Sequence, residues 1–156
     1  MRGKKKAPKR QLRPDLKYSN ITVAKLINYI MERGKKSTAQ RVVYDCFDYI
    51  TEKTKQDPIE VFELAIRNVG PALEVRSKRV GGANYQIPFP VKGDRKLTLV
   101  LRWVLKAARD RKGKPMAIKL AEELISASQN EGAAIKKRDD VQRMADANRA
   151  FAHFAR

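Results

Sequence analysis

Positively charged side chains far outnumber negatively charged ones in this chain, and this imbalance limits what it can fold into. The sequence has 35 lysines and arginines against 17 aspartates and glutamates, a formal net charge of +18 at pH 7. A compact body with that charge repels itself, so its folded state calls for a polyanionic partner. Nucleic acid and an anionic membrane surface are the two candidates.

A membrane partner is the weaker of these candidates. The longest stretch without a charged residue, 80–91, has twelve residues and includes two glycines and two prolines. It is too short to form a helix that crosses a bilayer. The basic N-terminus has no apolar segment, so it does not resemble a secretory signal. The sequence therefore predicts no membrane partner.

Cysteine and histidine are too scarce for the common metal sites. Cys46 and His153 each occur once, which excludes an internal disulfide and a zinc site built from Cys and His within this chain. Cys46 falls on an apolar helical stripe and is predicted to be a core residue. We expect a reducing, intracellular compartment, no metal and no cofactor.

The positive charge is not confined to one end of the chain. Residues 1–17 hold eight basic side chains against one acidic, and residues 18–156 still hold 27 against 16. Pro8 and Pro14 interrupt any helix near the N-terminus, so residues 1–17 are predicted to be a basic extension that orders on an anionic partner. Residues 18–156 are predicted to form a single helical domain.

Apolar residues recur at helical spacing through most of that domain. Six helices are predicted: three begin near Asn20, Ser37 and Asp57, and three span about 94–109, 115–128 and 133–154. Asn20 and Asp57 are expected N-caps, and Ser37 with Gln40 forms a capping-box pattern. The predicted fold is all-α, a six-helix bundle.

Between the third and fourth helices the pattern changes to that of a β-hairpin arm, residues 73–90. Gly81-Gly82 provides a two-residue turn that tolerates positive φ. The predicted cross-strand pairs are Lys78 with Tyr85, Arg76 with Ile87 and Glu74 with Phe89. Neither face is cleanly apolar, and an isolated ribbon is marginal in water, so the arm is expected to need a partner surface.

Two basic clusters suit nucleic acid. Arg95, Arg102, Lys106 and Arg109 share one face of the fourth predicted helix, away from its apolar face, in a pattern typical of phosphate binding. Trp103 sits between the two faces, and both core packing and base stacking remain open for it. In the hairpin, basic residues lie beside Tyr85, which suits single-stranded or irregular RNA. Tyr85 could stack on a base or pack across the strands.

Signatures of an enzyme are absent. The segment 34–37, Gly-Lys-Lys-Ser, resembles the end of a phosphate-binding loop, but Tyr29 stands where its first glycine is needed and Lys36 intrudes before Ser37. No catalytic residue and no small-molecule substrate is predicted. A DNA-binding regulator is the alternative, but its single recognition helix fits poorly with charge spread over an arm, a hairpin and several helices.

Three long motifs resemble the family of small-subunit ribosomal protein seven, in its bacterial or organellar form: GKKSTA at 34–39, VRSKRVGGANYQIP at 75–88 and AIKKRDDVQRMADANRAFAH at 134–153. The resemblance covers essentially the whole chain. It implies a six-helix body with a hairpin arm, and a structural part of a ribonucleoprotein that takes part in translation. This chain ends His-Phe-Ala-Arg where bacterial members commonly end in a His-Tyr-Arg-Trp type tail.

The resemblance also implies the partners. Members bind the 3′ major domain of small-subunit ribosomal RNA, start assembly of the head, and lie near messenger RNA and the tRNA of the exit and peptidyl sites. They contact ribosomal proteins nine and eleven. A cytoplasmic ribosome is implied, and an organellar one stays open.

The residues expected at these contacts follow from the same resemblance and from the charge pattern. Those expected at ribosomal RNA are Arg2, Lys4, Lys5, Lys6, Lys9, Arg10, Arg13, Lys35, Lys36, Arg76, Lys78, Arg79, Arg95, Arg102, Lys106, Arg109 and Lys114. Those expected near tRNA or messenger RNA are Gly81, Gly82, Asn84, Tyr85, Lys136, Lys137 and Arg143.

Overall fold

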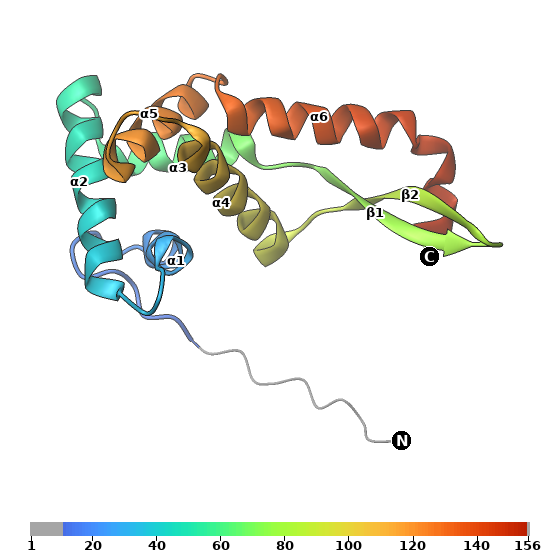
Figure 1. Cartoon of the computed structure of the whole chain (residues 1–156), viewed down its shortest axis with the longest axis horizontal. Helices are drawn as coiled ribbons and strands as arrows, with labels where there is room; N and C mark the ends of the chain where they lie inside the picture. Colours follow the sequence, from blue (N-terminus) through green and yellow to red (C-terminus); the bar gives the residue numbers. More distant parts are fainter. Residues whose placement is uncertain (1–10, 156) are drawn as a thin grey trace, which may run out of the picture.

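The fold is a helical body with a β-hairpin that extends from it (Figure 1). The computed structural model describes residues 11–155. The elements in chain order are α1 (Ile21–Ile30), α2 (Lys36–Thr54), α3 (Pro58–Val69), β1 (Leu73–Val80), β2 (Ala83–Pro90), α4 (Gly93–Asp110), α5 (Met116–Ser128), α6 (Ala133–Ala147) and the 3₁₀ helix η1 (Arg149–Ala155). We call α1–α5 the helical body and residues 73–90 the hairpin arm.

The predicted six helices and the hairpin between α3 and α4 are confirmed. The Asn20 side chain accepts hydrogen bonds from the backbone N–H groups of Thr22 (2.7 Å) and Val23 (3.4 Å), and so caps α1. Asp57 accepts from the N–H of Ile59 at 2.9 Å and caps α3 in the same way.

The capping box predicted at Ser37 is wrong. Helix α2 begins one residue earlier, at Lys36, with Lys35 at its N-cap position and no side-chain cap. The Lys35 carbonyl already accepts the first helical hydrogen bond, from the N–H of Ala39 at 3.2 Å. Ser37 is therefore inside the helix, where its backbone cannot adopt the extended conformation that a capping residue needs.

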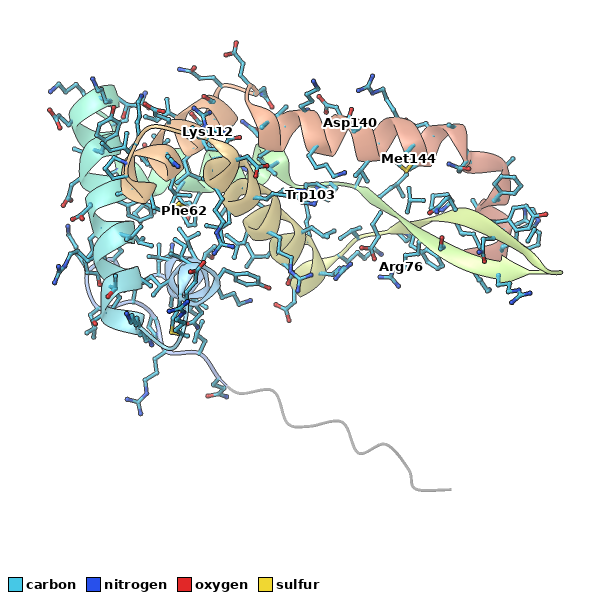
Figure 2. The ribbon with its side chains drawn as sticks, in the orientation of Figure 1. Phe62, Arg76, Trp103, Lys112, Asp140 and Met144 are labelled. Atoms are coloured by element: carbon cyan, nitrogen blue, oxygen red, sulfur yellow. The ribbon has the colours of Figure 1, made fainter. Side chains whose placement is uncertain are left out.

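The core forms where the apolar stripes of the helices meet. Its largest fully buried side chains include Phe47, Phe62 and Leu26, and Figure 2 shows Phe62 within the helical body. Cys46 is fully buried there, as predicted, and burial raises the pKa of its thiol. Within residues 11–155, no helix combines the length and the apolarity that crossing a bilayer requires.

The hairpin register is the predicted one: Lys78 lies opposite Tyr85, Arg76 opposite Ile87 and Glu74 opposite Phe89. Gly81 (φ 57°) and Gly82 (φ 92°) both adopt positive φ in the turn, a backbone conformation that residues with a Cβ rarely adopt. The partner surface that the arm was expected to need is part of the same chain. Helix α6 runs alongside the strands and η1 packs against β2 (Figure 1).

The sixth helix is shorter than predicted. Helix α6 ends at Ala147, and residues 149–155 continue as η1. Asn148 leaves the helical path, and both its backbone N–H (3.2 Å) and its side-chain amide (2.8 Å) donate to the carbonyl of Met144. A 3₁₀ helix aligns residues three apart, which brings Phe151 and Phe154 together against Tyr85 of the hairpin, at ring-centroid distances of 5.0 and 6.0 Å.

Candidate nucleic-acid interface

Helix α4 separates apolar from basic side chains as its sequence predicts. Leu101, Val104 and Ala108 are buried in the core. The four basic residues of the predicted stripe, Arg95, Arg102, Lys106 and Arg109, are all exposed. The helix thus holds four cations on a rigid surface, because its opposite face is packed against the rest of the body.

A shallow hollow beside α4 collects three of these cations. Arg102, Lys106 and Arg109 line it together with Tyr29 of α1. The Tyr29 hydroxyl donates a hydrogen bond to Oγ1 of Thr98 at 3.2 Å, which fixes the ring at the edge of the basic face. An aromatic ring among cations suits a nucleotide, whose phosphate and base need different contacts.

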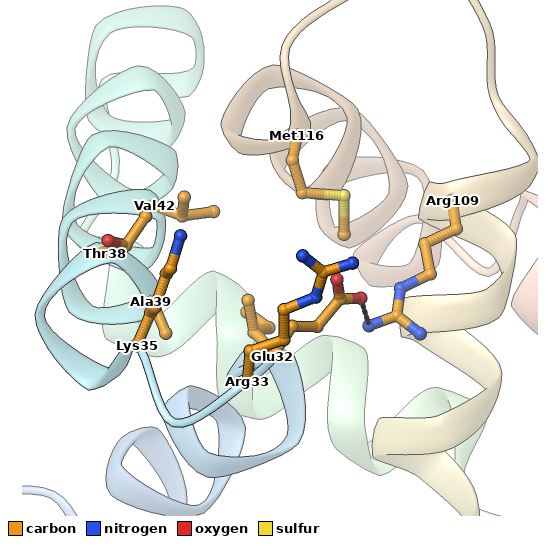
Figure 3. Close-up of a pocket in the computed structure, with 9 residues that line it drawn as sticks. Glu32, Arg33, Lys35, Thr38, Ala39, Val42, Arg109 and Met116 are labelled. Carbon is orange, nitrogen blue, oxygen red and sulfur yellow. Dashed lines mark hydrogen bonds and ion pairs between the residues drawn. The ribbon is translucent and has the colours of Figure 1, made fainter.

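A larger cavity of about 540 Å³ lies where the α1–α2 link meets α4 and α5 (Figure 3). Its apolar wall includes Ala39, Val42 and Met116, and its cations are Arg33, Lys35 and Arg109. Arg109 is held there by Glu32, whose carboxylate lies 2.9 Å from its guanidinium. An apolar wall with a cationic rim has the chemistry to receive an unstacked base and its phosphate.

A third groove joins α4 to α6. Lys106 lines it with Lys136 and Lys137, and its wall also includes Trp103, Asp110 and Asp140. Trp103 is half-buried and packs against the core, which supports core packing as its role. The exposed part of its side chain lines the groove. From the sequence, Lys106 was expected at ribosomal RNA and Lys136 and Lys137 near tRNA or messenger RNA, but the fold places all three along one groove.

These three hollows share members and therefore form one surface. Lys106 and Arg109 each line two of them. We call this surface the basic belt, made of Arg33, Lys35, Arg102, Lys106, Arg109, Lys136 and Lys137.

The opposite charge gathers elsewhere in the chain. The stretch 45–63, which covers most of α2 and the first half of α3, has only Lys53 and Lys55 as basic residues. Its acidic residues are Asp45, Asp48, Glu52, Asp57, Glu60 and Glu63. This stretch is therefore a mainly acidic part of the chain, and the basic belt itself also includes acidic neighbours, Glu32, Asp110 and Asp140.

Basic residues of the loop before α5 are paired with acidic residues of α5. Lys114 forms an ion pair with Glu122, and Arg111 pairs with Glu123 at 2.7 Å. The Glu122 carboxylate raises the pKa of the Lys114 ammonium, and Lys114 in turn lowers the pKa of Glu122. Of these residues only Lys114 was among those expected at RNA, and half of its side chain is still exposed.

At the base of the hairpin arm a single buried carboxylate holds two arginines. Glu74 accepts hydrogen bonds from Arg76 on Oε1, and from Arg95 on Oε2 with Nε at 2.9 Å. Burial by itself raises the pKa of the Glu74 carboxyl, but the hydrogen bonds and charges of Arg95 and Arg76 outweigh burial and lower it. Figure 2 shows Arg76 beside the strands, toward α4.

The tip of the hairpin arm is exposed at Arg79, Gly81, Gly82 and Asn84. Tyr85 is half-buried and packs against the η1 rings, an intramolecular contact that the sequence did not predict. The Lys78 ammonium donates to the carbonyl of Phe154 at 2.9 Å. The C-terminal segment therefore stabilises the end of the arm.

The remaining predicted residues are distributed as follows. Lys36 is exposed at the start of α2, and Arg143 is exposed on α6 beside Asp140, with which it pairs. Arg13 is exposed. The predictions for Arg2, Lys4, Lys5, Lys6, Lys9 and Arg10 lie outside the described residues.

Three residues of the candidate interface were not predicted from the sequence: Arg33 of the basic belt, Tyr29 beside the belt, and Glu74 at the base of the hairpin arm. Arg33 adopts a positive φ of 52° next to Gly34, so only the turn geometry shows which way it points. Tyr29 was considered only as a mismatch to a nucleotide-binding motif. Glu74 has the wrong charge for RNA, and only its pairing with a residue 21 positions away marks it as part of the site.

No three His, Cys, Asp or Glu side chains within residues 11–155 come together as a metal site would require. His153 is exposed in η1, with Nδ1 2.8 Å from the carbonyl of Ala150.

Comparisons with known proteins agree on one family. Residues 2–149 match the family described as Ribosomal protein S7p/S5e. The chain is 58% identical to "Small ribosomal subunit protein uS7" of Thermotoga petrophila over 151 residues, 97% of each chain. It is 53% identical to the protein of the same name from Ralstonia pickettii over 154 residues, 99% of each chain. It is also 53% identical to that of Chloroflexus aurantiacus, over 95% of this chain and 94% of the relative.

Proposed function

Because the chain belongs to the ribosomal protein S7p/S5e family, we propose that it binds the 3′ major domain of small-subunit ribosomal RNA and starts assembly of the subunit head. It is a structural constituent of the small ribosomal subunit and not an enzyme. The observation that carries the finer proposal is the basic belt, which gathers cations from three parts of the chain (the α1–α2 link, α4 and α6) onto one surface.

In this proposal the hairpin base and the belt residues of the α1–α2 link and α4 contact ribosomal RNA phosphates, while Lys136 and Lys137 lie on the α6 side of the belt, toward tRNA and messenger RNA. A guanidinium matches a phosphate with two parallel hydrogen bonds, which suits the arginines of α4. The apolar wall beside Met116 is suited to an unpaired base. The basic extension supplies further phosphate contacts, and Lys36, Lys78, Arg79 and Lys114 add them at the edges.

The hairpin tip and α6 are proposed to lie near tRNA and messenger RNA. Support comes from the family resemblance and from the exposure of Gly81, Gly82, Asn84 and Arg143. Contacts with ribosomal proteins nine and eleven, and a cytoplasmic location in the ribosome, are proposed on the resemblance alone.

Salt dependence tests the RNA-binding proposal directly. A protein that neutralises roughly 6–10 phosphates loses about 10³–10⁵ in affinity between about 50 and 200 mM salt. We expect a loss of this size in filter binding with a transcript of the 3′ major domain. A flat salt response contradicts the proposal. Tighter binding to duplex DNA than to structured RNA at the same salt would instead favour a DNA-binding protein.

A pair of substitutions tests the role of the hairpin. We expect Arg76→Ala with Arg79→Ala to weaken binding while helix content, measured by circular dichroism, is retained. The matched control is Lys53→Ala with Lys55→Ala, which removes the same charge from the acidic stretch of the chain. If both pairs weaken binding equally, total charge and not the hairpin sets the affinity.

A further inference from the structure

We propose that Glu74, an acidic residue, positions two arginines for RNA binding: its carboxylate holds Arg76 and Arg95 so that together they form one phosphate site at the base of the hairpin arm. This inference rests on the proposed function and adds to it a residue whose charge, taken alone, opposes RNA.

The geometry is that of one carboxylate shared by two forked cations. Arg76 donates from Nε (2.6 Å) and from Nη2 to Oε1 of Glu74. Arg95 approaches Oε2 with Nε at 2.9 Å and Nη2 at 2.8 Å. Each guanidinium thus turns the same edge toward Glu74, and Nη1 has no partner within residues 11–155.

Burial separates the acid from the bases. The Glu74 side chain is 7% exposed, while those of Arg76 and Arg95 are 54% and 46% exposed. Solvent, or a phosphate in its place, therefore reaches the guanidinium groups but hardly reaches the carboxylate. Two cations and one anion leave a net positive charge on the exposed side.

The role of the carboxylate is to order the arginines before RNA arrives. A free arginine side chain loses rotamer freedom on binding, and groups that are already held in place avoid that loss. Arg76 is further restrained by Phe89, with the guanidinium carbon 5.1 Å from the centre of the ring. The preorganised pair offers forked donors, the geometry that phosphate recognition requires.

The same contacts join two elements that are distant in sequence. Arg76 belongs to β1 and Arg95 to the first turn of α4, so Glu74 ties the base of the arm to the helix that carries three of the seven belt residues. A phosphate held by both arginines would contact the arm and the belt at once.

The direction in which one substitution changes RNA affinity distinguishes a positioning role of Glu74 from an effect of its charge alone. Glu74→Gln removes a negative charge, so an effect of charge alone makes RNA bind more tightly. Loss of positioning makes it bind more weakly, and we expect a loss of roughly tenfold for the 3′ major domain transcript. Asp48→Asn is the matched control, because it removes one carboxylate and one ion pair (with Lys17, 3.0 Å) far from the arm. It is expected to leave the affinity unchanged or slightly higher.

A double-mutant cycle shows whether Glu74 acts through the two arginines. In a chain that already carries Arg76→Ala and Arg95→Ala, Glu74→Gln is expected to leave RNA affinity unchanged or slightly higher, because only the loss of its negative charge can still act. An equal loss in both backgrounds overturns the proposal, as does tighter binding by the single variant. If Glu74→Gln fails to fold by circular dichroism, Arg95→Lys replaces it: this change keeps the charge but loses the fork, and unchanged affinity then contradicts the proposal.

The two levels of the argument fail separately. A wild-type chain with a flat salt response removes the proposed function whatever Glu74 does. A salt-sensitive wild type with a fully active Glu74→Gln variant removes only the positioning role.

Discussion

The helical body and the hairpin arm are stabilised by different interactions. Among the described residues, the main core cluster draws entirely on helices and includes no member of the arm. The arm is held by its strand ladder, the fully buried Ile87 of β2, the Glu74 ion pairs and the rings of η1 around Tyr85. Apolar burial is nearly independent of pH and of salt, whereas ion pairs depend on both. The body is therefore built to hold its shape alone, and the arm to depend on a few specific contacts.

The largest expected effect comes from the core of the body. Phe62→Ala removes a fully buried ring that lies 5.5 Å from the ring of Phe47, and should lower the free energy of unfolding by about 3–5 kcal/mol. Urea denaturation measures it. Leu64→Ala, on the exposed side of the same helix, is the control and should cost less than about 1 kcal/mol. Similar costs for both would mean that the body lacks a specific core.

A smaller and local effect is expected in the arm. Tyr85→Ala removes the ring that packs on Phe151 and Phe154, which contributes about 1 kcal/mol beyond the buried area. Hydrogen exchange should accelerate at residues 77–86 while the global unfolding free energy stays near its wild-type value. Tyr85→Phe keeps the ring and should preserve protection. A global loss as large as that of Phe62→Ala would erase the distinction between the two regions.

The smallest expected effect is a pH dependence that belongs to the arm. The pKa of Glu74 is lowered in the folded chain because of Arg95 and Arg76, despite the opposing effect of burial. A carboxyl with a lowered pKa adds stability above its unfolded pKa and loses it as pH falls through the folded one. We expect the stability advantage of wild type over Glu74→Gln to be constant above about pH 5 and to shrink below the ordinary pKa of 4.5.

Urea denaturation of both chains from pH 7 to pH 3 measures that advantage. The comparison cancels the contribution of other acids, such as Glu122, because both chains carry them. An advantage that grows as the pH falls would reverse the assigned direction of the Glu74 shift.

Prediction from sequence succeeded where the signal is local. The Asn20 and Asp57 caps and the Gly81-Gly82 turn depend on residues within a few positions of one another, and the structure contains all three. It failed at the start of α2 and the end of α6, where the local sequence pattern fits more than one helix boundary. At the C-terminus, packing of Phe151 and Phe154 against a hairpin about 70 residues earlier accompanies the change from α-helix to 3₁₀ helix.

The candidate site shows the same division. The exposure of Arg95, Arg102, Lys106 and Arg109 followed from helical periodicity alone, because one apolar face must be buried. That Lys106 shares a groove with Lys136 and Lys137 could not be predicted from the sequence, because no short-range pattern relates α4 to α6.

The sequence by itself determined the number and order of the helices and strands and the hairpin register, and it predicted a polyanionic partner. These depend on periodicity, turn chemistry and net charge, which are properties of neighbouring residues or of the whole composition. Only the tertiary structure decided which cations share a surface, where the C-terminal rings dock and what Glu74 does. These depend on distances between residues far apart in the chain, which are set when the apolar faces of the helices pack together.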